Sequence, residues 1–495
     1  MIENGLTAAQ HKMRDAGVAE QAITVFTHYY QSLEAGATGL IPEETIEPLT
    51  DIDSIDDVEL DPEAAREALA RTVIIKLNGG LGTSMGLDRA KTLLPVRDGK
   101  TFLDLIVEQI VAARRRYEVS LPLILMNSFR TREDSLAALA RHPEIEVDDL
   151  PLDFLQNRAP KLRADDLTPV SWEADPSLEW CPPGHGDIYT ALVASGVLDA
   201  LLERGYRYAM TANADNLGAA PSARIAGWFA ASGAPYAPEL CRRTPADVKG
   251  GHLAVRKSDG RIILRDTAQT PADQMHYFTD QFRHPFFHTN NLWFDLRVLR
   301  DTLIERDGIL GLPLIKNSKT VDPADSASTP VIQLETAMGA AVEAFEGATA
   351  VEVPRSRFLP VKTTNDLLLV RSDAYEVDED GLLQMVPERA CTVNLDPRYY
   401  KKIKDFDARF PSVRDRTPPA RRADDDHRRG YFTSTPPSMH WPRRYSVFSA
   451  ATGLVLSSTP PKMLVIWFST TTSLGTIMLT PPNRANTSIT APSLI

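Results

Sequence analysis

The segment KLNGGLGTSMGLDRAKTLLPV, residues 76–96, places four glycines directly after an apolar run and a lysine shortly beyond them. Glycine tolerates positive φ, and glycines after a strand let backbone N–H groups approach an anion. An ordinary glycine-rich surface turn is the alternative, but such a turn does not require a lysine at a fixed distance. The segment therefore predicts a triphosphate-binding loop, formed by Gly79, Gly80, Gly82, Gly86 and Lys91.

Two familiar glycine motifs do not describe this loop. A P-loop requires Gly-Lys followed by Ser or Thr, and a dinucleotide fingerprint requires GxGxxG. The spacing from Gly80 to Gly86 is GxGxxxG instead. The loop is thus of a different kind.

The elements that position the loop alternate between strand-like and helix-like runs. TVIIKL precedes the glycines, FLDLIVEQIVAARRR follows them at helical spacing, and LPLILM comes next. Strand, helix, strand in this order predicts a parallel sheet with helices on both faces. Further apolar runs, among them YRYAMTAN, GHLAVRK and NNLWFDLRVL, extend the same layer to about Ala374. The fold class expected is α/β.

The chain divides into four parts on composition and periodicity. We expect one or two amphipathic helices up to about Ala35, where glycines and a proline break the pattern. The expected parts are a helical segment at 1–40, a catalytic domain at 41–375, a linker or the start of a carboxyl-terminal domain at 376–412, and an atypical tail at 413–495.

The tail differs sharply in composition. All 66 acidic residues lie at or before Asp426. At that density the 69 residues that follow should hold ~11 acidic residues, yet they hold none. Thr-Pro-Pro clusters recur there, and the apolar patches lack a coherent period. The abrupt onset favours translation in a shifted reading frame over a disordered appendage.

Bulk properties exclude several classes of partner. The formal net charge of −12 over 495 residues leaves no basic excess for nucleic acid or an anionic membrane, so any phosphate site must be local.

Cys181, Cys241 and Cys391 are too far apart for a zinc or disulfide framework, and we expect reduced thiols. The sequence shows neither a secretory signal nor an apolar run long enough to span a bilayer. A cytoplasmic protein is expected.

The loop and seven further blocks resemble the UDP-glucose pyrophosphorylases of the eukaryotic type. LNGGLGTSMG followed by a lysine is similar to the nucleotide-binding loop of that family. The other blocks follow in the family's order over about residues 35–410: FLQNRAPK from Phe154, PPGHGDIY from Pro182, NADNLGA from Asn213, ADVKGG from Ala246, HTNNLW from His288, VIQLETAMGAA from Val331 and SRFLPVKTTNDLLLV from Ser356.

The resemblance implies a fold, a reaction and a metal. The fold is a Rossmann-like nucleotidyltransferase domain of the GT-A type, with a mixed sheet flanked by helices. The reaction joins UTP to glucose 1-phosphate, giving UDP-glucose and pyrophosphate with Mg²⁺. One phosphate oxygen attacks the α-phosphorus of UTP in line, and it needs no general base because a phosphate monoester has a second pKa of about 6.

The resemblance also implies which residues bind the nucleotide. The amide of Gln156 can pair with both donor and acceptor edges of uracil, although an ordinary loop glutamine is the alternative. Asn127 is proposed to border the nucleotide and the sugar phosphate. The nucleotide-binding residues implied are Leu77, Asn78, Gly79, Gly80, Gly82, Thr83, Gln156 and Gly184.

The catalytic, metal and sugar-binding residues follow in the same way. Lys91 and Lys362 would neutralise crowded phosphates. Asp215 is the candidate Mg²⁺ ligand, because magnesium is usually held by one or two carboxylates plus phosphate oxygens. A carboxylate at a strand end could instead cap the next helix. The substrate-binding residues implied are His185, with a hydrogen bond to donate, Asn213, Lys249, Asn290, Asn291 and Glu335.

The sequence departs from the family pattern in two places. The family commonly has Gly-Pro-Lys-Ser around the loop lysine, whereas this chain has Arg89-Ala90-Lys91-Thr92. Family members end in a left-handed parallel β-helix with hexapeptide-like repeats, which often mediates oligomerisation. Nothing after Ser412 shows that period, so this domain is expected to be absent or corrupted and the oligomeric state is left open.

Two other functions compete with the glucose enzyme. A related pyrophosphorylase could act on another sugar 1-phosphate, because a few polar contacts decide between such substrates. The loop LNGGLGTSMG, rather than LxGGxGTRLG, favours glucose. A binding protein for nucleotide sugars without turnover is the other alternative, and the presence of Lys91, Asp215 and Lys362 argues against it.

Overall fold

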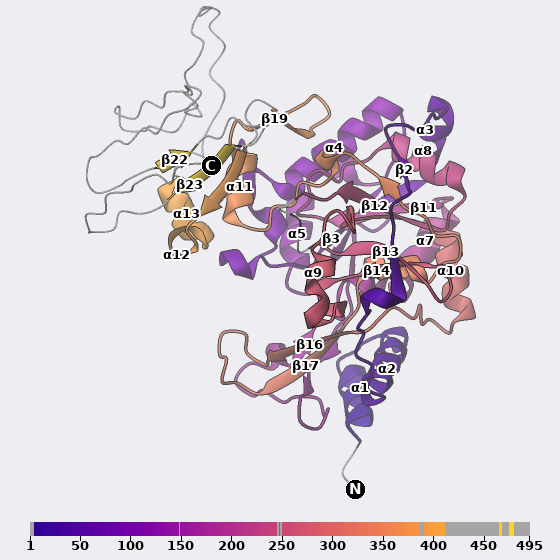
Figure 1. Ribbon diagram of the computed structural model, residues 1–495, viewed down its shortest axis with the longest axis vertical. Coiled ribbons are helices and arrows are strands. Elements are labelled where there is room, and N and C mark those ends of the chain that lie inside the picture. Colours follow the sequence, from indigo (N-terminus) through magenta and orange to yellow (C-terminus); the bar gives the residue numbers. More distant parts are fainter. Residues whose placement is uncertain are drawn as a thin grey trace, which may run out of the picture.

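A mixed eight-stranded sheet forms the centre of the molecule (Figure 1). The computed structural model describes residues 4–147, 149–244, 247, 250–386, 391–410, 465–467 and 475–479. All strands of the sheet run the same way except β15, which is antiparallel to both neighbours. In spatial order they are β2 (Asp53–Ser54), β18 (Val351–Glu352), β12 (Tyr236–Arg242), β15 (Phe286–Asp295), β11 (Tyr208–Asn213), β3 (Thr72–Asn78), β6 (Leu123–Asn127) and β7 (Asp153–Leu155).

Each face of this sheet is covered by helices. Successive residues of β3 point to opposite faces, so Val73 and Ile75 enter one hydrophobic core while Ile74 enters the other. The face that holds Ile74 packs against α3 (Pro62–Ala70), α4 (Phe102–Tyr117), α8 (Ala223–Ser232) and α11 (Thr364–Arg371). The face that holds Val73 and Ile75 packs against α6 (Ile188–Ala194), α7 (Val197–Glu203) and α10 (Leu296–Glu305).

The expected α/β class with helices on both faces is confirmed, and the sheet is mixed as the family resemblance implied. The apolar periodicity had indicated only a parallel sheet. β15 departs from that pattern because it enters the sheet between β11 and β12 from the opposite end. Strand direction is not encoded in side-chain alternation, which is the same for parallel and antiparallel strands.

Smaller elements surround the central layers. The remaining helices are α1 (Gly5–Asp15), α2 (Glu20–Glu34), α5 (Arg132–Leu139), α9 (Met275–Phe278), α12 (Pro397–Tyr400) and α13 (Ile403–Arg409). The strands described before residue 387, apart from those of the central sheet, are β1 (Ile46–Pro48), β4 (Pro95–Arg97), β5 (Lys100–Thr101), β8 (Ala159–Pro160), β9 (Leu162–Arg163), β10 (Trp180–Cys181), β13 (His252–Arg256), β14 (Ile262–Arg265), β16 (Ile315–Thr320), β17 (Pro330–Glu335), β19 (Tyr375–Val377) and β20 (Leu383–Met385). No helix of the described ranges is long and apolar enough to cross a membrane.

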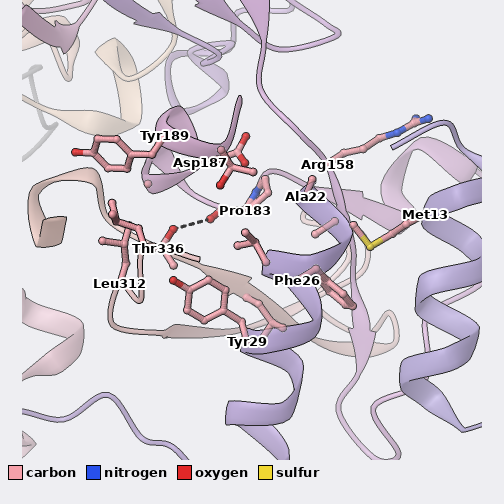
Figure 2. A pocket seen from close by; sticks show the side chains of 16 residues that line it. Met13, Ala22, Phe26, Tyr29, Arg158, Pro183, Asp187, Tyr189, Leu312 and Thr336 are labelled. Carbon is pink, nitrogen blue, oxygen red and sulfur yellow. Dashed lines mark hydrogen bonds between the residues drawn. The ribbon is translucent and has the colours of Figure 1, made fainter. Parts of the chain in front are cut away.

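The expected amino-terminal helices are α1 and α2, which lie side by side at one end of the molecule (Figure 1). Lys12 pairs with Glu179 at 2.5 Å, and the Tyr30 hydroxyl donates to the carbonyl of Leu167. A cavity of about 40 Å³ lies between α2 and the segment that carries Asp187, as Figure 2 shows. This volume holds roughly one or two water molecules, so the contact is essentially closed.

Two short strands of the tail are described. β23 (Gly475–Leu479) pairs in parallel with β21 (Cys391–Leu395) and antiparallel with β22 (Val465–Trp467). The rest of the predicted tail, 413–495, lies outside the described residues. The expectations of a shifted reading frame and of a missing β-helix therefore stay predictions.

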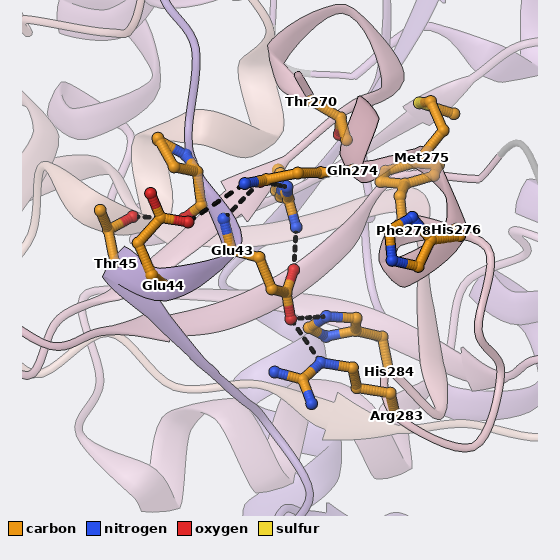
Figure 3. Close-up of polar contacts among 12 residues, drawn as sticks. Glu43, Glu44, Thr45, Thr270, Gln274, Met275, His276, Phe278, Arg283 and His284 are labelled. Atoms are coloured by element: carbon orange, nitrogen blue, oxygen red, sulfur yellow. Dashed lines mark hydrogen bonds and ion pairs between the residues drawn. The ribbon is translucent and has the colours of Figure 1, made fainter. Parts of the chain in front are cut away.

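The carboxylate of Glu43 ties the start of the α/β domain to the β13–β14 hairpin (Figure 3). It accepts hydrogen bonds from Arg265, from Arg283 Nε at 2.5 Å and from His284 Nε2 at 3.1 Å. Burial raises the pKa of Glu43, but the hydrogen bonds from Arg283 and Arg265 outweigh burial and leave the pKa lowered. The Arg265 side chain is wholly inaccessible to water, and the Glu43 carboxylate neutralises its positive charge.

We expect Glu43→Gln to lower the free energy of unfolding by about 3 kcal/mol, because it leaves the buried guanidinium of Arg265 without a counter-charge. The matched control is Glu44→Gln, since the neighbouring Glu44 is exposed and accepts one hydrogen bond from Gln274. Urea unfolding followed by circular dichroism measures both. Equal losses in the two variants would contradict the proposed role of Glu43.

Candidate functional site

The predicted site residues gather where four neighbouring strands end. β3 runs into the glycine loop, β6 ends at Asn127, β7 leads to Gln156 and β11 leads to Asp215. These strands are adjacent and parallel, so their carboxyl ends open on one edge of the sheet. In open α/β sheets such an edge is where ligands bind.

Asp215 lies between the two predicted catalytic lysines. Lys91 Nζ donates to Asp215 Oδ2 at 2.6 Å, and Lys362 Nζ lies 3.2 Å from the same oxygen and 3.4 Å from Oδ1. These residues are 124 and 147 positions from Asp215 in the chain. The fold therefore brings together the three residues that the sequence marked for phosphate chemistry.

The two lysines keep the Asp215 carboxylate ionised. Burial raises the pKa of Asp215, but the charges of Lys362 and Lys91 outweigh burial and hold the pKa below its usual value. Lys91 is mostly buried, whereas the Lys362 side chain is 55% exposed. The site thus contains one fixed cation and one that can move toward a ligand.

Both lysines are attached to short structured segments. The Lys91 backbone N–H donates to the carbonyl of Gly80, which fixes the lysine beside the glycine loop. Lys362 immediately precedes α11, where Asp366 accepts from the backbone N–H groups of Lys362 and Thr363. The Val361 N–H donates to the carbonyl of Asp215. Backbone geometry as well as charge therefore sets the spacing between Asp215 and Lys362.

The glycine loop has the geometry that its residues predicted at two positions. Gly82 and Gly86 adopt left-handed backbone angles, with φ of 63° and 77°. At Gly79 the constraint is one of space, since a Cβ there would lie 2.8 Å from Gln156 Oε1. Gln156 therefore closes over the loop from the end of β7. Thr83 and Gly80 are exposed at the mouth of the loop, and Leu77 is partly buried beneath it.

The amides of Asn78 and Asn127 are buried behind the loop. Asn78 Nδ2 donates to Asn127 Oδ1 at 2.7 Å and to Ser135 Oγ at 2.8 Å, while Thr92 donates to Asn78 Oδ1 at 2.6 Å. Asn127 in turn donates to Asp153. These side chains join β3 to β6, so only the backbone of Asn78 is placed to meet a nucleotide.

Gly184 and His185 form the opposite wall. Gly184 has a φ of 84° and packs directly on the backbone of Thr336, so no Cβ fits. His185 Nδ1 accepts a hydrogen bond from Met338 N–H at 2.9 Å. Since Nδ1 is the acceptor, the proton of the neutral ring is on Nε2, which can donate to a ligand.

His185 is neutral at physiological pH. The residue is exposed in the cleft, but protein atoms around its ring displace part of its water. This desolvation, together with the charge of Lys362, lowers its pKa to about 4. The imidazole is therefore suited to hydrogen bonding rather than to holding a charge on a phosphate.

The other predicted sugar contacts differ in their placement. Asn213 ends β11 and is partly exposed beside Asp215. Asn290 is partly exposed and holds a left-handed φ of 61° within β15. Glu335 ends β17, with Lys319 Nζ 3.7 Å from its Oε1. Lys249 lies outside the described residues.

Asn291 does not line the cleft, and the prediction that it contacts substrate is not supported by its position. Its side chain is fully buried and donates to Glu239 Oε2 at 3.0 Å and to the carbonyl of Arg357 at 3.2 Å, while its oxygen accepts from Asn216. Alternation along β15 turns Asn290 toward the cleft and Asn291 away from it. Asn291 therefore supports the site from behind.

Sequence reasoning missed two buried residues next to the predicted ones. Asp187 accepts from the Asn157 N–H at 2.6 Å and from Asn157 Nδ2 at 2.9 Å, which ties the Gln156 loop to the Gly184 turn. Burial raises the pKa of Asp187 to about 6. Asn216 makes four hydrogen bonds behind Asp215. Both lie inside the quoted blocks PPGHGD and NADN, which is the only signal that the sequence offers for them.

The residues present fit a magnesium ion that is bound mainly by its nucleotide. The described part of the chain contains no group of three His, Cys, Asp or Glu side chains able to hold a metal by themselves. Asp215 supplies one ionised carboxylate at the centre of the cleft. One carboxylate with phosphate oxygens and water is the usual arrangement for Mg²⁺ in nucleotide enzymes.

Comparison with known proteins gives concordant matches. The family model described as UTP--glucose-1-phosphate uridylyltransferase matches residues 23–417. The UTP--glucose-1-phosphate uridylyltransferase of Solanum tuberosum is 39% identical over 379 residues, covering 76% of this chain and 75% of the relative. The enzyme of that name from Saccharomyces cerevisiae is 42% identical over 348 residues, covering 70% and 68%.

Solved structures match in the same way. A mutant UDP-glucose pyrophosphorylase from Leishmania major in complex with UDP-glucose is 44% identical, with a TM-score of 0.76 over 82% of this chain and 88% of that chain. A structure described as UDP-glucose phosphorylase from Trypanosoma brucei is 43% identical, with a TM-score of 0.75 over 81% and 87%. The family match over residues 23–417 includes every residue of the cleft.

We expect Gly79→Ala to weaken UTP binding ~10-fold, which corresponds to about 1.4 kcal/mol, because the new methyl group displaces the Gln156 amide. Gly80→Ala is the matched control, since a Cβ at Gly80 meets nothing within 4 Å and its φ is not positive. Isothermal titration calorimetry compares the two. Unchanged affinity in Gly79→Ala would show that Gln156 does not bind the nucleotide.

Proposed function

The chain belongs to the family of UTP--glucose-1-phosphate uridylyltransferases, and from this premise we propose that it joins UTP to glucose 1-phosphate to give UDP-glucose and pyrophosphate. The observation that carries the proposal is the pairing of Lys91 and Lys362 on Asp215 at the mouth of the glycine loop. Two cations around one carboxylate are suited to crowded phosphates, because they offset the repulsion between the reacting anions.

The reaction requires positioning and charge neutralisation. An oxygen of the glucose 1-phosphate attacks the α-phosphorus of UTP, a new P–O bond forms, and the bond to the bridging oxygen breaks to release pyrophosphate. Lys91, fixed beside the glycine loop, would hold the triphosphate. Lys362, the more exposed lysine, would stabilise charge that develops between the two substrates.

Mg²⁺ is the cofactor that we propose, with Asp215 as its protein ligand. When bound, the ion would neutralise phosphate charge and favour the in-line geometry. Asp215 would hold the ion through the carboxylate that now accepts from Lys91 and Lys362, and the two lysines would then pair with phosphate oxygens. The ionised state of Asp215 supports this exchange, because only the carboxylate is a good ligand for a hard cation.

The remaining walls provide the binding contacts. Gln156 would read the uracil edge, and backbone N–H groups from Gly79 to Thr83 would surround the phosphates. His185 would donate from Nε2 to the sugar phosphate or sugar. Asn213, Asn290 and Glu335 are proposed as further sugar-side contacts, and Lys249 as a contact from the segment that precedes β13.

We propose a cytoplasmic location and a role as a transferase of carbohydrate metabolism. The two cysteines whose side chains are described, Cys181 and Cys241, are buried and unpaired, which fits a reducing compartment. Burial raises the pKa of both thiols to about 12, so neither is a reactive thiolate. UTP, glucose 1-phosphate, UDP-glucose and pyrophosphate are the proposed partners.

Pyrophosphate release from UTP with Mg²⁺ and a series of sugar 1-phosphates tests the reaction. Glucose 1-phosphate should give the highest kcat/KM. A higher value with galactose or N-acetylglucosamine 1-phosphate would assign the chain to a related activity. UDP-glucose binding without turnover of any sugar phosphate would favour a binding protein instead.

We expect Lys91→Ala and Lys362→Ala each to lower kcat by ~10²–10³-fold, as loss of a charge-stabilising group commonly does. The two effects should differ in KM. Because Lys91 is fixed beside the loop, its removal should also raise the KM for UTP, whereas Lys362→Ala should leave this KM within ~3-fold of wild type. The control is Lys257→Ala, which removes an exposed lysine whose Nζ donates to the carbonyl of Glu44 and makes no bond to Asp215. Retained turnover in both catalytic variants would contradict the mechanism.

We expect kcat/KM for glucose 1-phosphate to fall as the pH drops through ~6, where the sugar phosphate takes up its second proton. His185 should not contribute to this decline, because its lowered pKa of about 4 keeps the ring neutral above pH 5. His185→Gln should therefore reduce activity while leaving the acid limb in place. Disappearance of the limb in His185→Gln would show that the histidine, not the substrate, titrates there.

A further inference from the structure

The side-chain amide of Asn216 uses its full hydrogen-bonding capacity behind the catalytic cleft. Asn216 is 2% exposed. Its Nδ2 donates to Asn291 Oδ1 at 3.0 Å and to the Arg357 carbonyl at 3.2 Å, and its Oδ1 accepts from Leu359 N–H at 2.7 Å and Gly218 N–H at 3.2 Å. A primary amide can donate two hydrogen bonds and accept two, so none is left for a ligand.

Two of these bonds reach the segment that carries Lys362. Arg357 and Leu359 lie on the chain between β18 and α11, five and three residues before Lys362. Asn216 also forms a β-bridge with Pro360, and the next N–H, of Val361, donates to the Asp215 carbonyl. Asn216, which directly follows Asp215, therefore joins this segment to the stretch of chain that carries Asp215.

The side chain of Lys362 has little else to position it. It is 55% exposed, and its Nζ contacts are to Asp215 alone among the hydrogen bonds and ion pairs of the described residues. A lysine side chain has four rotatable bonds and reaches whatever its backbone allows. The position of its Cα relative to Asp215 is thus set by the bonds of its backbone segment, and two of these bonds are made by the Asn216 side chain.

We propose that Asn216 is a positioning residue for Lys362, which it holds at the distance from Asp215 that phosphoryl transfer requires. This inference rests on the proposed function. The Asn216 amide has no hydrogen bond left for a substrate or a metal, so we expect it to act through the lysine. Loss of the hydrogen bonds between Asn216 and the segment before Lys362 should therefore lower turnover and leave UTP binding unchanged.

A double-mutant cycle separates positioning from a general effect on folding. We expect Asn216→Ala to lower kcat ~10–100-fold, because a shift of about 1 Å in a reacting group costs this much, with the KM for UTP changed less than ~3-fold. In the Lys362→Ala background the same substitution should cost no more than ~2-fold in kcat, because the group that it positions is gone. An assay with radiolabelled pyrophosphate measures the low kcat of the slow variants.

Gln109→Ala is the matched control. Gln109 is buried, and its amide donates to the carbonyl of Leu217 in the same loop and to Gly381, but not to the segment before Lys362. It should lower thermal stability as much as Asn216→Ala while leaving kcat within ~2-fold. Asn216→Asp is the second variant. Its side chain is isosteric and still accepts from Leu359 N–H, but it can no longer donate to the Arg357 carbonyl or to Asn291 Oδ1, so kcat should fall at least ~10-fold.

The outcomes are distinct. If wild-type protein releases no pyrophosphate, the proposed function fails, whatever Asn216 does. If wild type is active and Asn216→Ala lowers kcat by the same factor with and without Lys362, Asn216 does not act through the lysine and the inference is overturned. It is also overturned if Asn216→Asp folds and retains the wild-type kcat. Non-additivity together with a lowered kcat in folded Asn216→Asp supports it.

Discussion

The charge of Glu239 has to be satisfied inside the protein, and the catalytic edge of the sheet is arranged around it. Glu239 is fully buried on β12 and accepts from Arg357 Nη2 at 2.7 Å and Nε at 3.0 Å, from Trp293 Nε1 at 2.9 Å and from Asn291. Breaking such a buried pair costs roughly 3–5 kcal/mol, since the remaining charge has no counter-ion. Burial, with a further contribution from Arg357, lowers the pKa of neighbouring Lys76 to about 7. A full positive charge on Lys76 is therefore disfavoured beside the Glu239–Arg357 pair. Arg357, and with it the chain leading to Lys362, is therefore anchored from within the core.

The central layers could be predicted because periodicity reports burial directly. TVIIKL is buried on both sides and reads as a continuous apolar run, as a central parallel strand should. The reversed direction of β15 could not be obtained in this way, because alternation along a strand is independent of the direction of its neighbours. The short strands that close the sheet edge, β2 and β18, have two residues each and leave almost no pattern. Their pairing depends on contacts between segments almost 300 positions apart.

The candidate site was predictable to the extent that its residues follow recognisable strands. Lys91, Asp215 and Lys362 were each marked by their blocks, and the structure places them in contact. Asn290 and Asn291 show the limit of this reasoning. They are chemically identical neighbours, and only the register of β15 decides that one faces the cleft while the other binds Glu239. The two missed residues, Asp187 and Asn216, have no distinctive type or spacing. A buried polar side chain is recognised by its hydrogen-bond partners, which the sequence does not show.

The contact between Asp215 and the two lysines has a consequence for how the cleft meets its first ligand. Without it, two ammonium groups would face each other across a narrow space, and each would either retain its hydration or swing away. With the carboxylate between them, the lysines are already stripped of part of their water and already point at a common centre. A triphosphate then enters by exchange of one anion for another, so the number of charge pairs changes little. Binding of this kind should depend less on dissolved salt than binding to an isolated cluster of lysines, and little reorganisation is left for the chemical step.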